Sequence, residues 1–152
     1  MVRAPIERGK SSTFVQALPL WWLGTDPDMH IGITAVTDSL ATRRTRMVRA
    51  VIESSAVEQG QDTVGGRLHE VFPALKPHKS ERWTDDEFVV QRRHADPNAS
   101  VLAAGIGSAR IGGTRLHRLV FDDPESDPKR AMSEADRSTT SDWTWGQAEG
   151  RL

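Results

Sequence analysis

The chain contains no cysteine, which excludes disulfides and thiolate metal sites and is compatible with a reducing cytoplasm. It also lacks any apolar run approaching the roughly 18 residues that a membrane span needs. The longest apolar cluster, FVQALPLWWLG, is interrupted by Gln16 and Pro19. This cluster follows a polar segment and has no Ala-x-Ala type exit, unlike a signal peptide. We therefore expect a cytosolic protein with no membrane partner.

Net charge is also small. The formal charge of -1 gives no global attraction to polyanions, so contact with DNA would need a local basic patch. With 37% apolar and 27% charged residues, the composition suits a globular protein. Its 152 residues are enough for one core, and no domain boundary is visible, so we expect a single domain over 1–152.

Hydrophobic periodicity predicts two helices around a strand in the first part of the chain. The first helix should begin near Ser11, be kinked or cut short by Pro19, and be capped by Gly24. Residues 29–35 are typical of a buried strand. A second helix should begin at Thr37 or Asp38 and bury one face, made of Leu40, Met47, Val48, Val51 and Ile52.

The rest of the chain predicts strands with a polar excursion before them. Residues 56–83 are expected at the rim of the domain, with one or two helical turns near Leu68 and Leu75. Residues 87–93 and 100–106 should be strands joined by a turn, and 118–123 (RLVFDD) a third strand. A further helix is expected to open at Asp127–Pro128. Strands alternating with helices indicate an α/β fold, with a mainly parallel sheet and helices on both faces.

The segment APIERGKS, residues 4–11, fits the phosphate-loop pattern G-x-x-x-x-G-K-[ST], except that Ala4 replaces the first glycine. In such a loop the backbone around Gly9 surrounds a β-phosphate and Lys10 bridges the β- and γ-phosphates. The Ser11 hydroxyl ligates Mg²⁺, and a helix pattern follows at once from Ser12. The alternative is a solvated lysine in a helix-capping turn.

A second motif strengthens the nucleotide interpretation. The apolar strand in LVFDD ends in Asp122 and Asp123, an acid pair that suits a nucleotide site. The first acid would hold the Mg²⁺ shell and the second would polarise the attacking water. Taken alone, two aspartates before a proline are more often a turn or a helix cap.

Together these motifs resemble the ATPase domain of a phage terminase large subunit, the motor that pumps DNA into viral capsids. The likeness covers most of the chain, in order AP..RGKS, LPLWWLGTDPD, TDSLATRRTRMVRAVIE, FVVQRR..DPNASVLAAGIGSARIGGTRLHRLVFDDP and SEADR. In that family the passage here containing Gly112, Gly113 and Arg115 leads into the Walker B strand. The resemblance implies a P-loop NTPase fold of the RecA-like (ASCE) type.

The resemblance also implies functions and partners. Lys10 and Ser11, with Gly9 and Ser12, would bind ATP and Mg²⁺. Asp122 would hold the metal, Asp123 would orient water, and Arg8 would respond to the γ-phosphate, unless it is an exposed loop arginine. The implied partners are double-stranded DNA, the portal, the small terminase subunit and further copies in the motor, in the host cytoplasm.

Two departures qualify this expectation. Many relatives have glutamate as the second acid, and the shorter Asp123 threatens turnover rather than binding. Only Met1–Arg3 precede the loop, and the chain stops at Arg151–Leu152, before the family's nuclease domain. We therefore expect a fragment, or a split or decayed prophage product. The alternatives are a non-catalytic remnant that retains the fold, and another P-loop DNA motor such as a helicase.

Other candidate residues favour structural interpretations. Arginines 43, 44, 46 and 49 are either a DNA contact or, as we prefer, a solvated helix face. GIGSARIGG favours tight turns over a second phosphate loop. The five histidines have no zinc-ligand spacing, and Asp85, Asp86 and Glu87 are expected in a polar turn. Trp21, Trp22 and Trp143 are expected to anchor the core.

Overall fold

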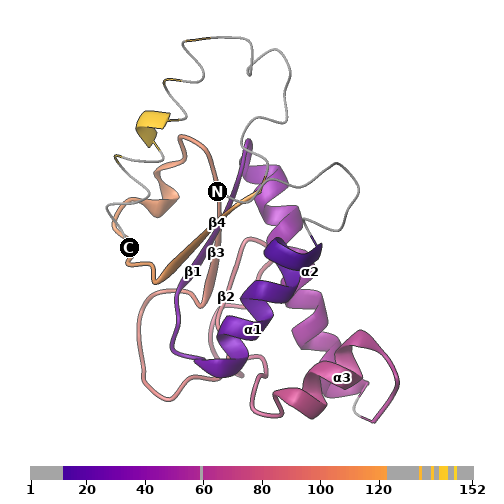
Figure 1. Cartoon of the computed structure of the whole chain (residues 1–152). Helices are drawn as coiled ribbons and strands as arrows, with labels where there is room; N and C mark the ends of the chain where they lie inside the picture. Colours follow the sequence, from indigo (N-terminus) through magenta and orange to yellow (C-terminus); the bar gives the residue numbers. More distant parts are fainter. Residues whose placement is uncertain are drawn as a thin grey trace.

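The structure, a computed structural model, describes residues 12–58 and 60–122 together with residues 134, 138, 141–143 and 146. The described residues begin with a π-helical turn at Ser12, and helices and short strands follow it (Figure 1). The elements in order are η1 (Ser12–Ala17), α1 (Leu18–Thr25), β1 (Ile31–Ala35), α2 (Asp38–Val57), α3 (Val64–Val71), β2 (Glu87–Phe88), β3 (Val101–Gly105), η2 (Ala109–Ile111) and β4 (Arg118–Phe121). The predicted α/β class is confirmed.

The four strands form one mixed sheet in the order β2-β3-β1-β4. Strand β1 lies in the centre and pairs in parallel with both β3 and β4. The short β2 pairs antiparallel with β3. It is an edge strand because it stands at the end of the strand order. All five residues of β1 and of β3 are buried, as expected for parallel strands covered on both faces. The prediction of a mainly parallel sheet therefore holds for three of the strands.

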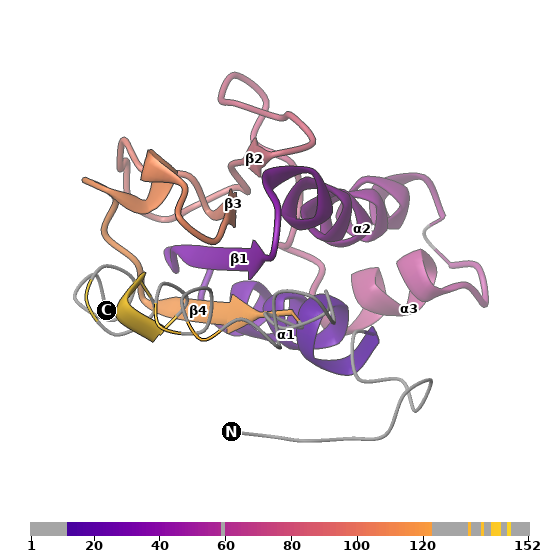
Figure 2. The ribbon, with the colours of Figure 1, turned by 90° about the horizontal axis from the view of Figure 1, so that it is seen from above.

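The prediction of helices on both faces holds in part: α1, α2 and α3 cover one face, whereas the described residues on the other face include only the 3-10 turn η2 and helical residues 141–143. Side chains from η1, α1 and α2 pack on one face, where they form the main core with Ile31, Ile33, Val101 and Val120. Figures 1 and 2 show α1, α2 and α3 on the same side of the strands. The other face is covered by Ile111 and Leu116 of the β3–β4 connection, and by Trp143. That connection is too short for a long helix, so a single turn of 3-10 helix, η2, takes its place.

The first helix changes its winding near Pro19, where the sequence predicts a kink or an end. It differs from the sequence prediction at Gly24. Its winding changes from π to α between Ala17 and Leu18, directly before Pro19, which lacks a backbone N–H to continue the ladder. Gly24 is not a terminal cap, because α1 continues to Thr25. A Cβ at Gly24 would lie 2.4 Å from Cγ of Phe72. Glycine at this position therefore permits close packing of α1 against the Phe72 ring.

Helix α2 begins where the sequence predicts. Thr37 is its N-cap, and the Thr37 hydroxyl oxygen accepts a hydrogen bond from the Leu40 N–H at 3.3 Å. Val48 and Ile52 are fully buried as expected. Leu40, however, is exposed, because the first turn packs through Ala41, which contacts Ala35 and Ala103 instead.

The tryptophans are only partly the core anchors that we expected. Trp143 is buried and meets Phe121 edge to face, and Trp22 packs partly buried against the main core. Trp21 is 57% exposed and touches the edge of the Phe72 ring, so the prediction is wrong for Trp21. None of the described helices combines the length and apolar composition that crossing a bilayer requires.

Candidate functional site

The carboxyl ends of three parallel strands meet at one edge of the sheet. Strands β1, β3 and β4 end at Ala35, Gly105 and Phe121, and β1 lies between the other two. In open α/β sheets, ligands bind outside the carboxyl ends of the strands. This edge, called the carboxyl edge below, is therefore where a site is sought first.

Asp122 lies at this edge, directly after β4. Its backbone N–H donates to the Thr34 carbonyl of β1 at 2.8 Å, which extends the β1–β4 pairing by one residue. The Thr34 hydroxyl in turn donates to the Val120 carbonyl at 3.1 Å. The Asp122 side chain is only 4% exposed. A carboxylate this deeply buried requires charged or hydrogen-bonding partners.

Arg44, from the second turn of α2, supplies one such partner. Its Nε atom donates to Oδ2 of Asp122 at 2.5 Å, and the Arg44 side chain is 28% exposed. A hydrogen bond between two charged groups is shorter and stronger than a neutral one. The pair joins α2 to the end of β4, which lie far apart in the sequence.

The start of α2 also packs against the end of β3. Oδ1 of Asp38 accepts a hydrogen bond from the Gly105 N–H at 2.6 Å. A Cβ on Gly105 would lie 2.5 Å from the Asp38 nitrogen, so the two segments touch through backbone. The Leu40 and Ala41 N–H groups donate to Thr37. The N-terminus of α2 is thus covered by β3 and is a poor cradle for a phosphate.

Helix η1 lies farther from the amino ends of the strands than α1 does. The helical segment from Ser12 to Thr25 is roughly 20 Å long by its rise per residue, and β1 is about 17 Å long. Because α1 ends a few residues before β1 begins, the segment runs back along the sheet from the amino ends of the strands toward the carboxyl edge (Figure 1). Helix η1 contacts both α2 and β4.

The sequence-predicted site residues fall in two groups. Asp122 is buried at the carboxyl edge, and Ser12 is the first residue of η1. Arg8, Gly9, Lys10, Ser11 and Asp123 lie outside the described residues. Sequence reasoning missed the contributions of Arg44, Asp38 and Gly105, although Asp38 carried a signal as a candidate helix cap.

The arginines of α2 differ in exposure, and three of the four are paired with acids. Arg46 reaches Asp85 at 2.6 Å, and Arg49 reaches the same carboxylate at 3.1 Å. The other two acids of that group are also paired, Asp86 with Arg110 at 2.7 Å and Glu87 with Arg82 at 3.0 Å. Our preference for a solvated arginine face is therefore wrong for Arg44 and Arg49, which are half-buried, and holds for Arg43 and Arg46, which are exposed. Asp85 and Asp86 lie in the expected polar turn ahead of β2, whereas Glu87 is the first residue of β2.

A second polar cluster lies at the opposite edge, where the parallel strands begin. The rings of His30 and His117 stack, with centroids 5.0 Å apart and planes at 15°. The His30 N–H donates to Nδ1 of His117 at 3.0 Å, and the His117 N–H donates to the His30 carbonyl at 2.8 Å. We call this region the amino edge. Sequence spacing carried no signal for the pair, because 86 positions separate the two residues in the chain.

The buried His30 has acceptors at both ring nitrogens. Nδ1 lies 2.9 Å from the Ala99 carbonyl, and Nε2 lies 3.5 Å from Oδ2 of Asp96. Hydrogen bonds from the Asn98 backbone hold the pKa of Asp96 below its ordinary value, despite desolvation. Desolvation, followed by the neighbouring His30, lowers the pKa of His117. The cluster therefore favours a neutral His117 that accepts the His30 N–H.

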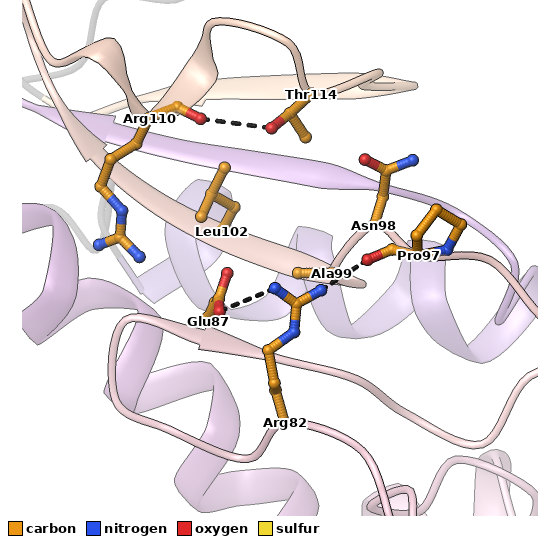
Figure 3. A pocket seen from close by; sticks show the side chains of 8 residues that line it. All are labelled: Arg82, Glu87, Pro97, Asn98, Ala99, Leu102, Arg110 and Thr114. Carbon is orange, nitrogen blue, oxygen red and sulfur yellow. Dashed lines mark hydrogen bonds and ion pairs between the residues drawn. The ribbon is translucent and has the colours of Figure 1, made fainter.

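A small cavity of about 180 Å³ lies beside the edge strand β2 (Figure 3). Its lining residues include Arg82, Glu87, Leu102 and Arg110. Arg82 donates to Glu87 at 3.0 Å and to the Pro97 carbonyl at 2.6 Å. The volume is below the roughly 300 Å³ at which small-molecule sites begin. Because both arginines are paired with acids, this cavity is a weaker candidate than the carboxyl edge.

Within the described part of the chain, no group of three or more histidine, aspartate or glutamate side chains is arranged to hold a metal. A divalent ion at Asp122 would therefore need oxygen ligands from a bound phosphate and from water, as Mg²⁺ commonly has. The carboxylate of Asp122 is a hard oxygen donor that fits this ion. No protein-family model and no curated protein matches this chain.

Proposed function

We propose that the chain binds Mg-ATP at the carboxyl edge, between the Arg8–Ser12 segment and Asp122, as an ATPase domain of the terminase large-subunit type. The observation that carries the proposal is the burial of Asp122 directly after β4, at the carboxyl edge of the sheet. The phosphate-loop sequence directly precedes η1, and η1 contacts β4, the strand that Asp122 directly follows.

Packing at the edge supports this choice of phosphate-binding segment. The start of α2 is covered by β3 through the Asp38–Gly105 contact. The phosphate-loop segment that precedes η1 in the sequence is the alternative that we propose. Its Gly9-Lys10-Ser11 sequence supplies backbone N–H groups, a cation and a hydroxyl, which are the groups that recognise a β- and γ-phosphate.

In the proposed reaction, water attacks the γ-phosphorus, the bond to the β-γ bridging oxygen breaks, and ADP and phosphate leave. Mg²⁺, when bound, neutralises charge on the β- and γ-phosphate oxygens. Lys10 binds those phosphates, Ser11 and Asp122 hold the metal and its water shell, and Asp123 orients the attacking water. Arg8 stabilises negative charge on the transferring group.

The biological task that goes with this proposal is DNA packaging, in which hydrolysis drives translocation of double-stranded DNA. Portal, small-subunit and homo-oligomeric partners belong to the same proposal. The α2 arginines are not proposed as the DNA contact, because Arg44, Arg46 and Arg49 are engaged within the molecule. A remnant that binds nucleotide without turnover is the second candidate, favoured by the short Asp123 side chain.

Isothermal titration calorimetry with Mg-ATP tests the proposal. Wild type is expected to bind, and Lys10→Ala is expected to abolish binding because the loop loses its phosphate-bridging cation. Lys79→Ala, at an exposed lysine outside the site, is the matched control and should bind as wild type does. We expect hydrolysis to be slow or absent. A folded wild type with no affinity for nucleotide would contradict the proposal.

A further inference from the structure

Arg44 differs from its neighbours on α2 in what it contacts. Its guanidinium is directed to the buried Asp122 carboxylate, and Nε and Oδ2 are 2.5 Å apart. Arg46 instead pairs with the surface acid Asp85, and Arg43 is exposed. One turn after Arg44, the fully buried Val48 anchors α2 to the core. The position of Arg44 relative to β4 is therefore set by core packing rather than by a flexible surface segment.

We propose that Arg44 is a positioning residue that holds the Asp122 carboxylate in the metal-free protein and shares it when nucleotide and metal bind, so that α2 responds to metal loading. This inference rests on the proposed function of Asp122 as the metal-holding acid. It adds a residue that the phosphate-loop and acid-strand motifs do not contain.

A buried carboxylate is costly without a compensating cation, and Arg44 provides one that requires no ligand. A divalent ion near the same carboxylate adds positive charge close to the guanidinium, and like charges at a few ångströms repel strongly in a partly buried site. Arg44 must therefore weaken metal binding while it stabilises the metal-free protein.

Loss of the Arg44 charge should lower the stability of the metal-free protein but strengthen metal binding. These opposite effects distinguish the proposed role from that of a purely structural ion pair. Arg44→Gln removes the charge but keeps a polar side chain of similar reach. We expect the variant to unfold at a lower temperature than wild type in EDTA. We also expect Mg²⁺, added with a non-hydrolysable ATP analogue present, to raise the unfolding temperature of the variant by more than that of wild type. We call this rise the metal-dependent increment. The difference should correspond to Mg²⁺ binding that is about three- to tenfold tighter than in wild type.

Two variants serve as comparisons. Arg43→Gln makes the same change at the adjacent exposed arginine, and it should leave the metal-dependent increment unchanged. Arg44→Lys keeps the positive charge and should restore an increment close to that of wild type. In EDTA, Arg44→Gln should cost much less stability in an Asp122→Asn background than in wild type, because the charge pair is already lost there.

A measurement on the wild type guards against a variant that fails to fold. The Nε–H resonance of Arg44, assigned by its disappearance in Arg44→Lys, should shift when Mg²⁺ is added to the protein that holds the ATP analogue. A resonance that does not move would overturn the inference, as would an Arg44→Gln increment equal to or smaller than that of Arg43→Gln. If wild type responds to neither nucleotide nor Mg²⁺, the proposed function fails first and the role of Arg44 in it fails with it.

Discussion

The amino and carboxyl edges of the same three strands both hold polar side chains, but these side chains have different kinds of hydrogen-bond and ion-pair partners at the two edges. At the amino edge, His30 and His117 are bonded to each other, to the Ala99 carbonyl and to Asp96, all within the ends and loops of the sheet. At the carboxyl edge, the buried Asp122 is joined to Arg44, which comes from a helix.

The difference fits the roles that we propose for the two edges. The amino edge is a network in which backbone groups take part in most contacts, so its polar atoms tie the strand starts together. The carboxyl edge places one buried negative charge opposite a side chain that can move without breaking the sheet. An exchangeable partner suits a binding site, whereas a network built on backbone suits a structural joint. The predictions below test this comparison, from the largest expected effect to the smallest.

Gly105→Ala tests how closely the carboxyl edge is packed. The added Cβ would lie 2.5 Å from the Asp38 nitrogen and 2.8 Å from the Thr37 carbonyl carbon. Both are backbone atoms, so β3 and the start of α2 must separate. We expect a loss of about 2 to 3 kcal/mol in the free energy of unfolding, measured by urea denaturation.

Gly107→Ala is the control for this change. Gly107 has φ of 83° and nothing within 4 Å of an added Cβ, so it carries only the backbone cost of a left-handed conformation. That cost is on the order of 1 kcal/mol. Equal losses at the two glycines would show that crowding at the carboxyl edge is unimportant.

His117→Asn tests the amino edge through pH. The pKa of His117 is lowered in the folded state, first by desolvation and then by His30 and Arg115, while Asp26 acts in the opposite direction. As the pH falls below the ordinary histidine pKa of about 6.5, residue 117 therefore binds its proton more readily in the unfolded chain than in the folded one. The stability due to His117 is complete above that pH and is lost as pH falls through the lower folded pKa.

The asparagine variant keeps an oxygen that can accept the His30 N–H but removes the titrating ring. Between about pH 7.5 and 5.5 it should lose less stability than wild type does, as measured by urea denaturation at each pH. His78→Asn, at a histidine whose ring accepts only a long bond from Ser80, should follow the wild-type pH dependence. A His117→Asn curve parallel to that of wild type would refute the structural role given to this edge.

Arg46→Gln should have the smallest effect. The Arg46 side chain is 59% exposed, and Arg49 also reaches Asp85 at 3.1 Å, so the carboxylate keeps a cation. An exposed pair of this kind contributes about 0.5 kcal/mol or less. In EDTA the loss should be clearly smaller than that of Arg44→Gln, and a loss of the same size would remove the distinction between a surface pair and the buried carboxyl-edge pair.

Local patterns predicted much of the chain correctly. The buried strand around Ile31 and Ile33, the Thr37 cap and the α2 core positions Val48 and Ile52 follow from periodicity and capping, which depend on neighbours in sequence. The errors have a common cause. Gly24, Leu40 and Trp21 were assigned from their local patterns alone. In the structure, Gly24 packs against Phe72, Ala41 takes the buried position expected for Leu40, and Trp21 lies on the solvent-facing side of α1.

The candidate site divides in the same way. The phosphate-loop and acid-strand motifs are local, so they point to Lys10, Ser11, Asp122 and Asp123 directly. The pairing of Arg44 with Asp122 could not be predicted, because it depends on how α2 crosses β3 and β1 and on the β1–β4 register. The same holds for His30 and His117, which parallel pairing brings to one edge.

The sequence by itself determined the α/β class, the order of most elements and the residues whose chemistry suits a phosphate and a metal, because these depend on spacing along the chain. Only the tertiary structure decided that α1, α2 and α3 lie on one face, and which cation meets which carboxylate. The physical reason is that burial and charge pairing depend on contacts between distant segments, and strand order and helix packing create those contacts.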